Sequence, residues 1–189
     1  MSEKYKTAEK EKAYFATFTI TEWVKVLQDH SGKMIIVDAI KYYQKQRGLV
    51  LYAFCIMPNH VHIIAQSNGT ETLSAVLRDL KKYTSKAITK KLEIENSDDG
   101  NKALSIFKTA GEKLKRITKY KVWQDGNRPK VLYSNKFIWQ KLNYIHNNPV
   151  EAGLVESAEN YLYSSARNYA DMESVLDVEI LAREMKTVR

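Results

Sequence analysis

Two histidines one residue apart are the strongest chemical signal in this sequence. His60 and His62 lie in residues 56–65, IMPNHVHIIA, a run that alternates like a β-strand. Residues i and i+2 of a strand point to the same face, so the two imidazoles can reach toward one point. Because neutral imidazole is the commonest side-chain metal ligand, the pair predicts half of a metal site. The alternative is two histidines on the wet face of an edge strand, and for an isolated pair this alternative would be favoured.

A second set of reactive groups lies near residue 145. Tyr144 and Asn148 are four residues apart in a segment with helical spacing of apolar residues, and Pro149 is expected to end that helix. The two side chains then share one helix face, so a phenol nucleophile and an amide oxygen could be offered together to whatever the histidines hold. His146 is a candidate to assist proton loss from Tyr144, although two positions along a helix point elsewhere. Tyr83, one of twelve tyrosines, is the rival nucleophile.

Strands and helices that alternate along the chain must position these groups. The predicted strands are residues 14–20, 50–57, 60–66 and 131–133, and a turn at Pro58-Asn59 sets His60 at the start of its strand. The predicted helices are 35–46, stopped by Gly48, then 72–92, and one through Leu104, Phe107, Leu114 and Ile117. Residues 95–101 are polar and predict a loop. This order predicts an α+β fold with an antiparallel sheet, as a single domain over residues 1–189. A C-terminal tail is expected from about residue 156, and its residues 161–169 would pack across the sheet.

Basic residues outnumber acidic ones, 30 Lys+Arg against 22 Asp+Glu, which gives a net charge of +8 and a pI near 9.3. This balance favours a polyanionic partner, although a merely soluble basic protein explains the charge equally well. The single cysteine, Cys55, is expected to be a small buried residue in a reducing compartment. The absence of a membrane-spanning run or a signal-peptide core predicts a cytoplasmic, nucleoid-associated protein without a membrane partner.

Two basic clusters are candidates for contacts to DNA. The first follows the helix at 72–92, and the second leads into Trp123. The residues proposed to contact DNA are Arg78, Lys81, Lys82, Lys86, Arg116, Lys119 and Trp123. A solvated helix face is the more frequent cause of such basic rows, and a core position is slightly favoured for Trp123.

The motif M-P-N-H-V-H, followed later by Y-I-x-x-N-P-V-x-A-G-L-V, resembles the single-tyrosine His-hydrophobic-His (HUH) transposases of small bacterial insertion sequences. The likeness is greatest to the relatives associated with repetitive extragenic palindromes (REP). It implies a ferredoxin-like palm with helices packed on the sheet. It further implies that His60, His62 and Asn148 bind Mg²⁺ or Mn²⁺ and that Tyr144 is the nucleophile. The implied activity is cleavage and rejoining of single-stranded DNA through a 5′-phosphotyrosine intermediate.

Other functions stay open at the level of sequence. A host-retained regulator that binds single-stranded or hairpin DNA with little turnover would use the same fold, although the four intact site residues argue against it. A replication or mobilisation nickase fits less well, because such enzymes usually carry larger accessory domains. Imidazole pairs generally suit transition ions, whereas Mg²⁺ prefers oxygen ligands, so the resemblance rather than the ligand chemistry favours Mg²⁺. Relatives include homodimers and monomers, which leaves a homodimer open.

Overall fold

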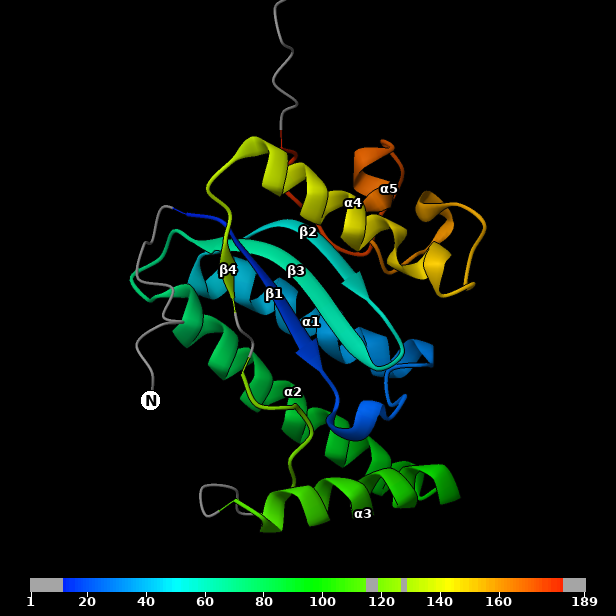
Figure 1. Cartoon of the computed structure of the whole chain (residues 1–189). Coiled ribbons are helices and arrows are strands. Elements are labelled where there is room, and N and C mark those ends of the chain that lie inside the picture. The colour runs from blue at the N-terminus through cyan, green and yellow to red at the C-terminus, as the bar shows by residue number, and fades with distance from the viewer. Residues whose placement is uncertain (1–11, 115–118, 127–128, 182–189) are drawn as a thin grey trace, which may run out of the picture.

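The computed structural model describes residues 12–114, 119–126 and 129–181 and has a four-stranded antiparallel sheet at its centre (Figure 1). The strand order is β2-β3-β1-β4. The strands are β1 (Tyr14–Thr19), β2 (Leu49–Ile56), β3 (His60–Ser67) and β4 (Lys130–Val131). Each predicted strand is present, with ends that differ by one or two residues.

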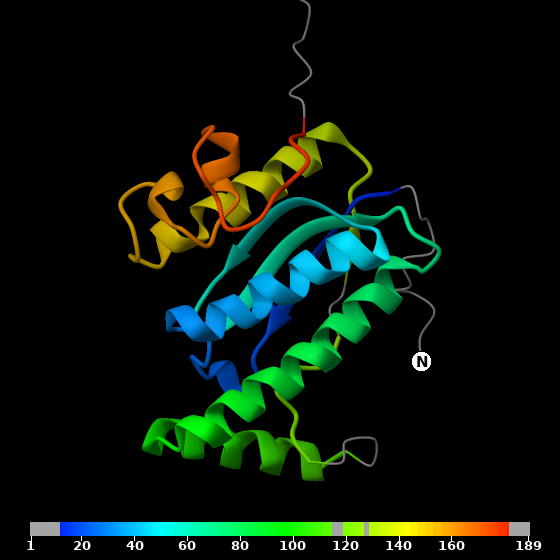
Figure 2. The same cartoon turned by 180° about the vertical axis from the view of Figure 1, so that it is seen from behind.

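Helices cover both faces of the sheet, as the two opposite views show (Figures 1 and 2). On one face lie α1 (His30–Arg47) and α2 (Leu73–Glu95), and α3 (Asp98–Glu112) packs beside α2. On the other face lies α4 (Asn135–Glu151), next to the short helices η3 (Ala158–Asn160) and α5 (Ala166–Tyr169). A 3-10 turn, η2 (Thr21–Trp23), follows β1. The predicted α+β fold with an antiparallel sheet is confirmed.

Alternate side chains of β3 point to opposite faces of the sheet. Val61, Ile63 and Ala65 are buried, whereas His62 points to the face covered by α4 and contacts Phe15 and Tyr144 there. The period of two that the sequence predicted is therefore what places the histidines on a single face.

Capping residues determine where α1 and α2 begin and where α1 ends. The hydroxyl of Thr72 accepts a hydrogen bond from Ala75 N–H at the start of α2, and Gly48 ends α1 with a left-handed φ of 66°, as predicted. Helix α1 begins earlier than predicted, because the Asp29 carboxylate accepts from Gly32 N–H.

The predicted loop at 95–101 is wrong, since only Asn96 and Ser97 separate α2 from α3. The Ser97 hydroxyl accepts a hydrogen bond of 3.1 Å from Gly100 N–H, and Asp98 and Asp99 occupy the first turn, where carboxylates favour the helix dipole. Polar residues here cap a helix instead of forming a loop. The predicted helix through 104–117 ends at Glu112, Leu114 lies beyond it, and Ile117 is outside the described residues.

The prediction that Pro149 ends its helix is also wrong. Pro149 lies inside α4, which continues to Glu151. After Glu151 the chain leaves the helix at Gly153, whose φ is +68°, with Gly153 N–H bonded to Val150 O and Leu154 N–H bonded to Pro149 O, both at 2.9 Å. This is a Schellman ending, in which a left-handed glycine satisfies the last carbonyl groups. The proline removes one amide donor, but the following residues retain the helical path.

The tail runs along the edge strand β2 and not across the sheet as predicted. Ile56 N–H bonds to Tyr163 O, and Ser165 N–H bonds to Phe54 O, both at 2.9 Å. Tyr161 and Tyr163 are buried against this edge, so the tail covers β2 and protects it from further pairing. Cys55 within β2 is fully buried, and burial raises the pKa of its thiol to about 12. None of the helices in the described parts of the chain is long and apolar enough to cross a membrane.

Candidate active site

All four residues expected at the site lie together where α4 crosses β3. The rings of His60 and His62 are 4.7 Å apart, and the His62 ring is 5.1 Å from the ring of Tyr144 (centroid distances). Asn148, one helical turn after Tyr144, has its Oδ1 3.1 Å from Nε2 of His60. The strand period and the helix period thus combine to bring two imidazoles, a phenol and an amide to one place.

His62 is buried and held from one side. Its Nδ1 is 2.8 Å from the hydroxyl of Thr17, and its ring stacks on Phe15. Its Nε2 is buried and has no hydrogen-bond partner. Burial, together with the positive charge of a protonated His60 and of Lys141, lowers the pKa of His62 to about 3. His62 is therefore neutral at pH 7, with a lone pair available for a cation.

His60 lies between two amide oxygens. Its Nδ1 is 2.7 Å from Oδ1 of Asn59, and its Nε2 faces Oδ1 of Asn148. Burial lowers the pKa of His60, opposed by the hydrogen bond with Asn148. A neutral imidazole donates from one nitrogen only. If Nδ1–H donates to Asn59, the lone pairs of His60 Nε2 and Asn148 Oδ1 face each other, an arrangement that a cation between them would stabilise.

The donor set fits a divalent cation. Two imidazole nitrogens and one amide oxygen suit an ion that accepts mixed nitrogen and oxygen ligands. The 3.1 Å between His60 Nε2 and Asn148 Oδ1 is close to the roughly 3 Å expected between adjacent ligands of an octahedral ion with bonds of about 2.1 Å. Among the residues that the structure describes, no three His, Cys, Asp or Glu side chains form a metal-binding group. A metal bound here would consequently need the Asn148 amide as a third protein ligand.

Tyr144 is partly open to solvent, 41% exposed, and has a cation beside it. The Lys141 ammonium lies 5.4 Å from the centre of the Tyr144 ring and 5.1 Å from that of Phe15. These contacts orient the phenol and place positive charge near it.

His146 and Tyr83 lie away from this site. His146 Nε2 is 2.9 Å from the Ser165 hydroxyl, and its ring contacts Tyr169, so His146 fastens α4 to the tail on the other side of the helix. The structure does not support His146 as an assistant to Tyr144. Tyr83 is exposed on α2, across the sheet from the histidines.

The basic residues of α2 are not brought to the site, because α2 and α4 cover opposite faces of the sheet (Figures 1 and 2). Arg78 pairs with Asp79, and Lys81 donates to the carbonyl of Gln124. Lys82 and Lys86 are exposed on this layer. In the second cluster Lys119 pairs with Glu93 at 2.9 Å, and Arg116 lies outside the described residues.

Trp123 is a core residue, the option slightly favoured by the sequence. It is 5% exposed, its Nε1 donates to the hydroxyl of Thr84 at 3.1 Å, and its ring meets Phe18 edge-on. A buried ring with its N–H satisfied cannot stack on a DNA base, so the predicted DNA contact at Trp123 is wrong.

Sequence analysis missed the residues that support the site. Thr17 and Asn59 hold the imidazoles, Lys141 lies over the tyrosine, and Trp23 contacts His60 edge-on with centroids 5.8 Å apart. Lys141 could have been found, since it precedes Tyr144 by three positions on a predicted helix. Thr17 could not, because its partner is 45 residues away and depends on the register of β1 with β3.

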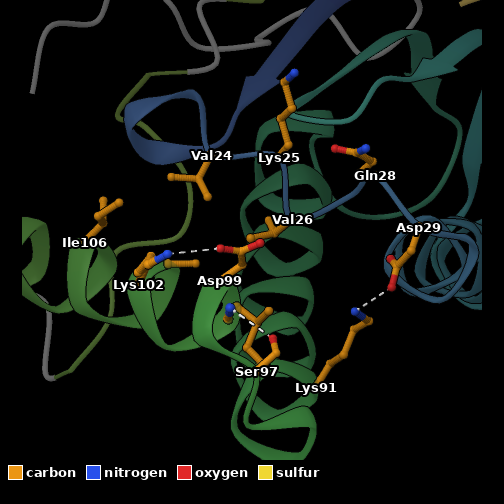
Figure 3. A pocket seen from close by; sticks show the side chains of 13 residues that line it. Val24, Lys25, Val26, Gln28, Asp29, Lys91, Ser97, Asp99, Lys102 and Ile106 are labelled. Atoms are coloured by element: carbon orange, nitrogen blue, oxygen red, sulfur yellow. Dashed lines mark hydrogen bonds and ion pairs between the residues drawn. The ribbon is translucent and has the colours of Figure 1, made fainter.

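Cavities near η2 include the following two. One, of about 410 Å³, opens beside His60 and Asn148. The other, of about 580 Å³, lies between the segment after η2 and the start of α3 (Figure 3). In the second, Asp29 pairs with Lys91 and Asp99 with Lys102, so these charged side chains neutralise one another. It contains none of the four site residues, so we place the active site at the first cavity.

An antiparallel sheet that carries a His-x-His pair beneath a tyrosine helix is the arrangement expected of the HUH transposase class. Residues 12–103 match the model of the family described as "Transposase IS200 like". This confirms the resemblance predicted from the sequence: over that segment the chain is similar to the IS200-like transposases.

Solved structures are similar to the chain as well. A REP-associated tyrosine transposase bound to a REP hairpin is 18% identical with a TM-score of 0.64, over 97% of this chain and 96% of that chain. A Deinococcus radiodurans protein described as a proposed transposase is 21% identical over 71% of this chain and 88% of that chain, but its TM-score of 0.38 is too low to indicate a common fold. The first likeness concerns the fold. No curated protein matches the chain significantly.

Proposed function

We propose that this protein is a transposase that cleaves and rejoins single-stranded DNA through a 5′-phosphotyrosine intermediate on Tyr144. One observation carries the proposal. The Tyr144 ring lies against His62, whose buried Nε2 has no partner, while His60 Nε2 and Asn148 Oδ1 face each other at 3.1 Å. A nucleophile beside an unpartnered imidazole nitrogen and a facing nitrogen–oxygen pair is suited to metal-assisted attack on a phosphodiester.

The DNA partner is proposed to be a single strand or a hairpin. The net charge of +8 favours a polyanion, and the solved relative with the same fold is bound to a REP hairpin. A strand that reaches Tyr144 would approach the sheet face covered by α4, where the phenol is open to solvent.

The reaction conserves the number of phosphoester bonds. The Tyr144 oxygen attacks phosphorus and loses its proton, the bond from phosphorus to the 3′ oxygen breaks, and the released 3′ oxygen takes up a proton. The 5′ phosphate is then esterified to Tyr144. Because the bond energy is retained, a 3′ hydroxyl of another strand can reverse the step without ATP, and this reversal is strand transfer.

The chain's own residues prepare this step. Phe15 and Lys141 orient the Tyr144 ring, and the Lys141 charge favours approach of a phosphate. Thr17 and Asn59 hold His62 and His60 through Nδ1, which leaves each Nε2 toward the site. A Mg²⁺ or Mn²⁺ ion held by His60, His62 and Asn148 would polarise the phosphate and neutralise its developing charge.

A covalent adduct tests this proposal. End-labelled hairpin oligonucleotides with single-stranded flanks are incubated with the protein and Mg²⁺ or Mn²⁺, and the products are separated on a denaturing gel. We expect a protein-linked fragment that requires the metal, is lost in His62→Ala and persists in the exposed control Tyr83→Phe. Binding of the same oligonucleotides without an adduct in any metal would contradict the proposal and favour the DNA-binding regulator.

A further inference from the structure

Trp23 is a large aromatic residue left open to solvent next to the candidate metal site. It is 56% exposed, whereas tryptophan is highly buried on average. Its backbone is also unusual, since Glu22 and Trp23 both have positive φ, 53° and 57°, a conformation that is costly for residues with a Cβ atom. Such strain persists only where the surroundings hold it, and it tends to occur at functional sites.

The support that holds Trp23 comes from the site itself. The Asn59 side-chain amide donates to Trp23 O at 3.3 Å, while its Oδ1 lies 2.7 Å from Nδ1 of His60. One asparagine thus fixes both the indole-bearing turn and a candidate metal ligand. The Trp23 and His60 rings contact each other in a T-shaped arrangement, and more than half of the Trp23 side chain stays exposed, so an open indole surface is held beside the site.

The cavity of about 410 Å³ lies between Trp23 and the end of α4. His60, Asn148 and Pro58 line it, and Lys25 and Glu151 provide charged groups. Its volume falls within the range of about 300–1,000 Å³ typical of small-ligand pockets. An aromatic face, a basic side chain and an adjoining phosphate-handling site are the features that bind an unpaired nucleotide.

Tyr144 and Trp23 lie at opposite ends of the site. Tyr144 contacts His62, whereas Asn148 and Trp23 contact His60, so α4 runs antiparallel to β3. Four residues of helix separate Tyr144 from Asn148, a rise of about 6 Å. The rings therefore follow the order Tyr144, His62, His60, Trp23.

We propose that the cavity beside Trp23 binds the base of the nucleotide immediately 5′ to the cleaved bond, here called position −1, stacked on the indole. The inference rests on the proposed function. In an in-line displacement the attacking and leaving oxygens lie on opposite sides of phosphorus. With Tyr144 attacking from the His62 end, the leaving 3′ oxygen and its nucleoside lie at the His60 end, next to Trp23.

This assignment has a consequence for rejoining. The strand that ends in the free 3′ hydroxyl is not linked covalently to the protein, so only non-covalent contacts keep it at the site. Stacking of its last base on Trp23 retains this strand, with its hydroxyl in place for the reverse reaction. Because every base has a stacking face, Trp23 tolerates different bases at −1.

The first step of the test locates the cleaved bond. The full-length protein is incubated with Mn²⁺ and a pool of hairpin oligonucleotides whose single-stranded flanks are randomised. Sequencing of the protein-linked and released fragments identifies positions −1 and +1, with Tyr144→Phe as the negative control. Failure of the whole pool to give a Tyr144-dependent adduct would remove the proposed function and this inference with it.

The second step measures coupling between Trp23 and position −1. Rates of adduct formation are compared for the intact substrate and for substrates with an abasic site at −1 or at +1. For the unmodified protein, loss of the −1 base is expected to lower the rate about 10-fold. Trp23→Ala should form the adduct more slowly than the unmodified protein on the intact substrate. Removal of the −1 base should then lower the rate of this variant by less than about 2-fold, since the stacking contact is already gone. The matched control is Tyr83→Ala, which removes an aromatic ring of nearly equal exposure, 55%, from the opposite layer.

Two outcomes would overturn the inference while leaving the proposed function intact. One is an equal penalty for the −1 abasic site in the unmodified protein and in Trp23→Ala. The other is coupling of Trp23 to position +1 instead of −1. Trp23→Phe, which keeps an aromatic ring, should restore part of the −1 dependence, an effect that a merely structural role of Trp23 would not produce.

Discussion

The surroundings of His62 disfavour its protonated form, and a neutral imidazole is the form that binds a metal. Its side chain is buried, its pKa is lowered to about 3, and its Nδ1 is occupied by the hydroxyl of Thr17. A partner on the second nitrogen of a ligating histidine fixes ring orientation and tautomer. Thr17 therefore belongs to the candidate site although its side chain does not face the ligand position.

Replacing Thr17 by valine is expected to weaken Mn²⁺ binding about 10- to 100-fold, because the His62 ring loses the contact that orients it. Isothermal titration calorimetry of Mn²⁺ into the protein measures this change. Thr19→Val, the same substitution two residues along β1, retains the contact to His62 and is the control. Equal affinities for the two variants would show that Thr17 does not support a metal ligand.

Lys141→Gln is expected to slow adduct formation about 10-fold, since it removes the cation beside the Tyr144 ring. Lys136→Gln removes a charge from the exposed first part of the same helix and should change the rate less than about 2-fold. Initial rates at several salt concentrations separate the two effects, because a direct phosphate contact also reduces the salt dependence. Indistinguishable rates would exclude a role for Lys141 at the nucleophile.

At the scale of elements, α4 is positioned by its contacts away from the site. His146 bonds to Ser165, and Ser165 in turn bonds to the backbone of Phe54 in β2. This connection fixes the helix relative to the sheet while Tyr144 and Asn148 face the histidines. A shift of α4 by one residue would move both side chains out of reach.

The fold should lose stability in mild acid. Burial lowers the folded-state pKa of His146 from 6.5 to about 4, so the unfolded chain binds the proton more tightly. The neutral, buried His146 contributes on the order of 3 kcal/mol to the free energy of unfolding. This contribution is fully present above pH 6.5 and is lost as the pH falls toward 4. Urea denaturation at pH 7 and at pH 4.5 measures the loss, which should be smaller in His146→Gln. An identical pH dependence in the two proteins would contradict the assignment.

Gly153→Ala is expected to lower the free energy of unfolding by about 1 kcal/mol, because a Cβ atom is unfavourable at a φ of +68°. Nothing lies within 4 Å of the added Cβ, so the cost is conformational and not steric crowding. Gly153→Asn should cost less, since asparagine tolerates this conformation better. If urea denaturation gave equal losses in the free energy of unfolding for Gly153→Ala and Gly153→Asn, the backbone conformation would not be the cause.

The local sequence pattern predicted most helices and strands correctly. It failed where polar residues are common both in loops and at the starts of helices. The alternation of β3, the apolar stripe of α2 and the stop at Gly48 were sufficient to identify those elements. Residues 95–101 looked like a loop because Ser97 and the aspartates suit loops as well as helix starts. Pro149 looked like a helix end because the Schellman ending at Gly153 depends on backbone bonds that the sequence does not display.

The residues of the candidate site could be predicted from the sequence only in part. Local periods place His60 with His62 and Tyr144 with Asn148, the family resemblance implied their roles, and the structure brings the four residues together. Residues whose role depends on strand register or on a turn, such as Thr17 and Trp23, were not predictable. The burial of Trp123 depends on packing between β1 and α2.

At the scale of the whole molecule, the sheet separates two surfaces with different uses. The histidines point to the face covered by α4, which supplies Tyr144, whereas α1 and α2 cover the opposite face (Figures 1 and 2). The exposed lysines of α2 lie on that second layer, across the sheet from α4 and Tyr144.

Lys82→Gln combined with Lys86→Gln should therefore leave cleavage of a short single strand unchanged within about 2-fold. If this row binds DNA, the double variant should weaken only the binding of longer hairpins, with a smaller salt dependence. Gel-shift titration and adduct rates on short and long substrates measure the two effects separately. A large loss of cleavage on the short strand would contradict the separation of the two surfaces.

The central claim is that Tyr144 becomes linked to DNA, and mass spectrometry of the adduct tests it most directly. After cleavage in Mn²⁺ the DNA is digested with nuclease, the protein with trypsin, and the modified peptide is fragmented to locate the added nucleotide. We predict a 5′-phosphonucleotide on Tyr144, absent from Tyr144→Phe and still present in Tyr83→Phe. A nucleotide on another tyrosine, or an adduct that persists in Tyr144→Phe, would contradict the account.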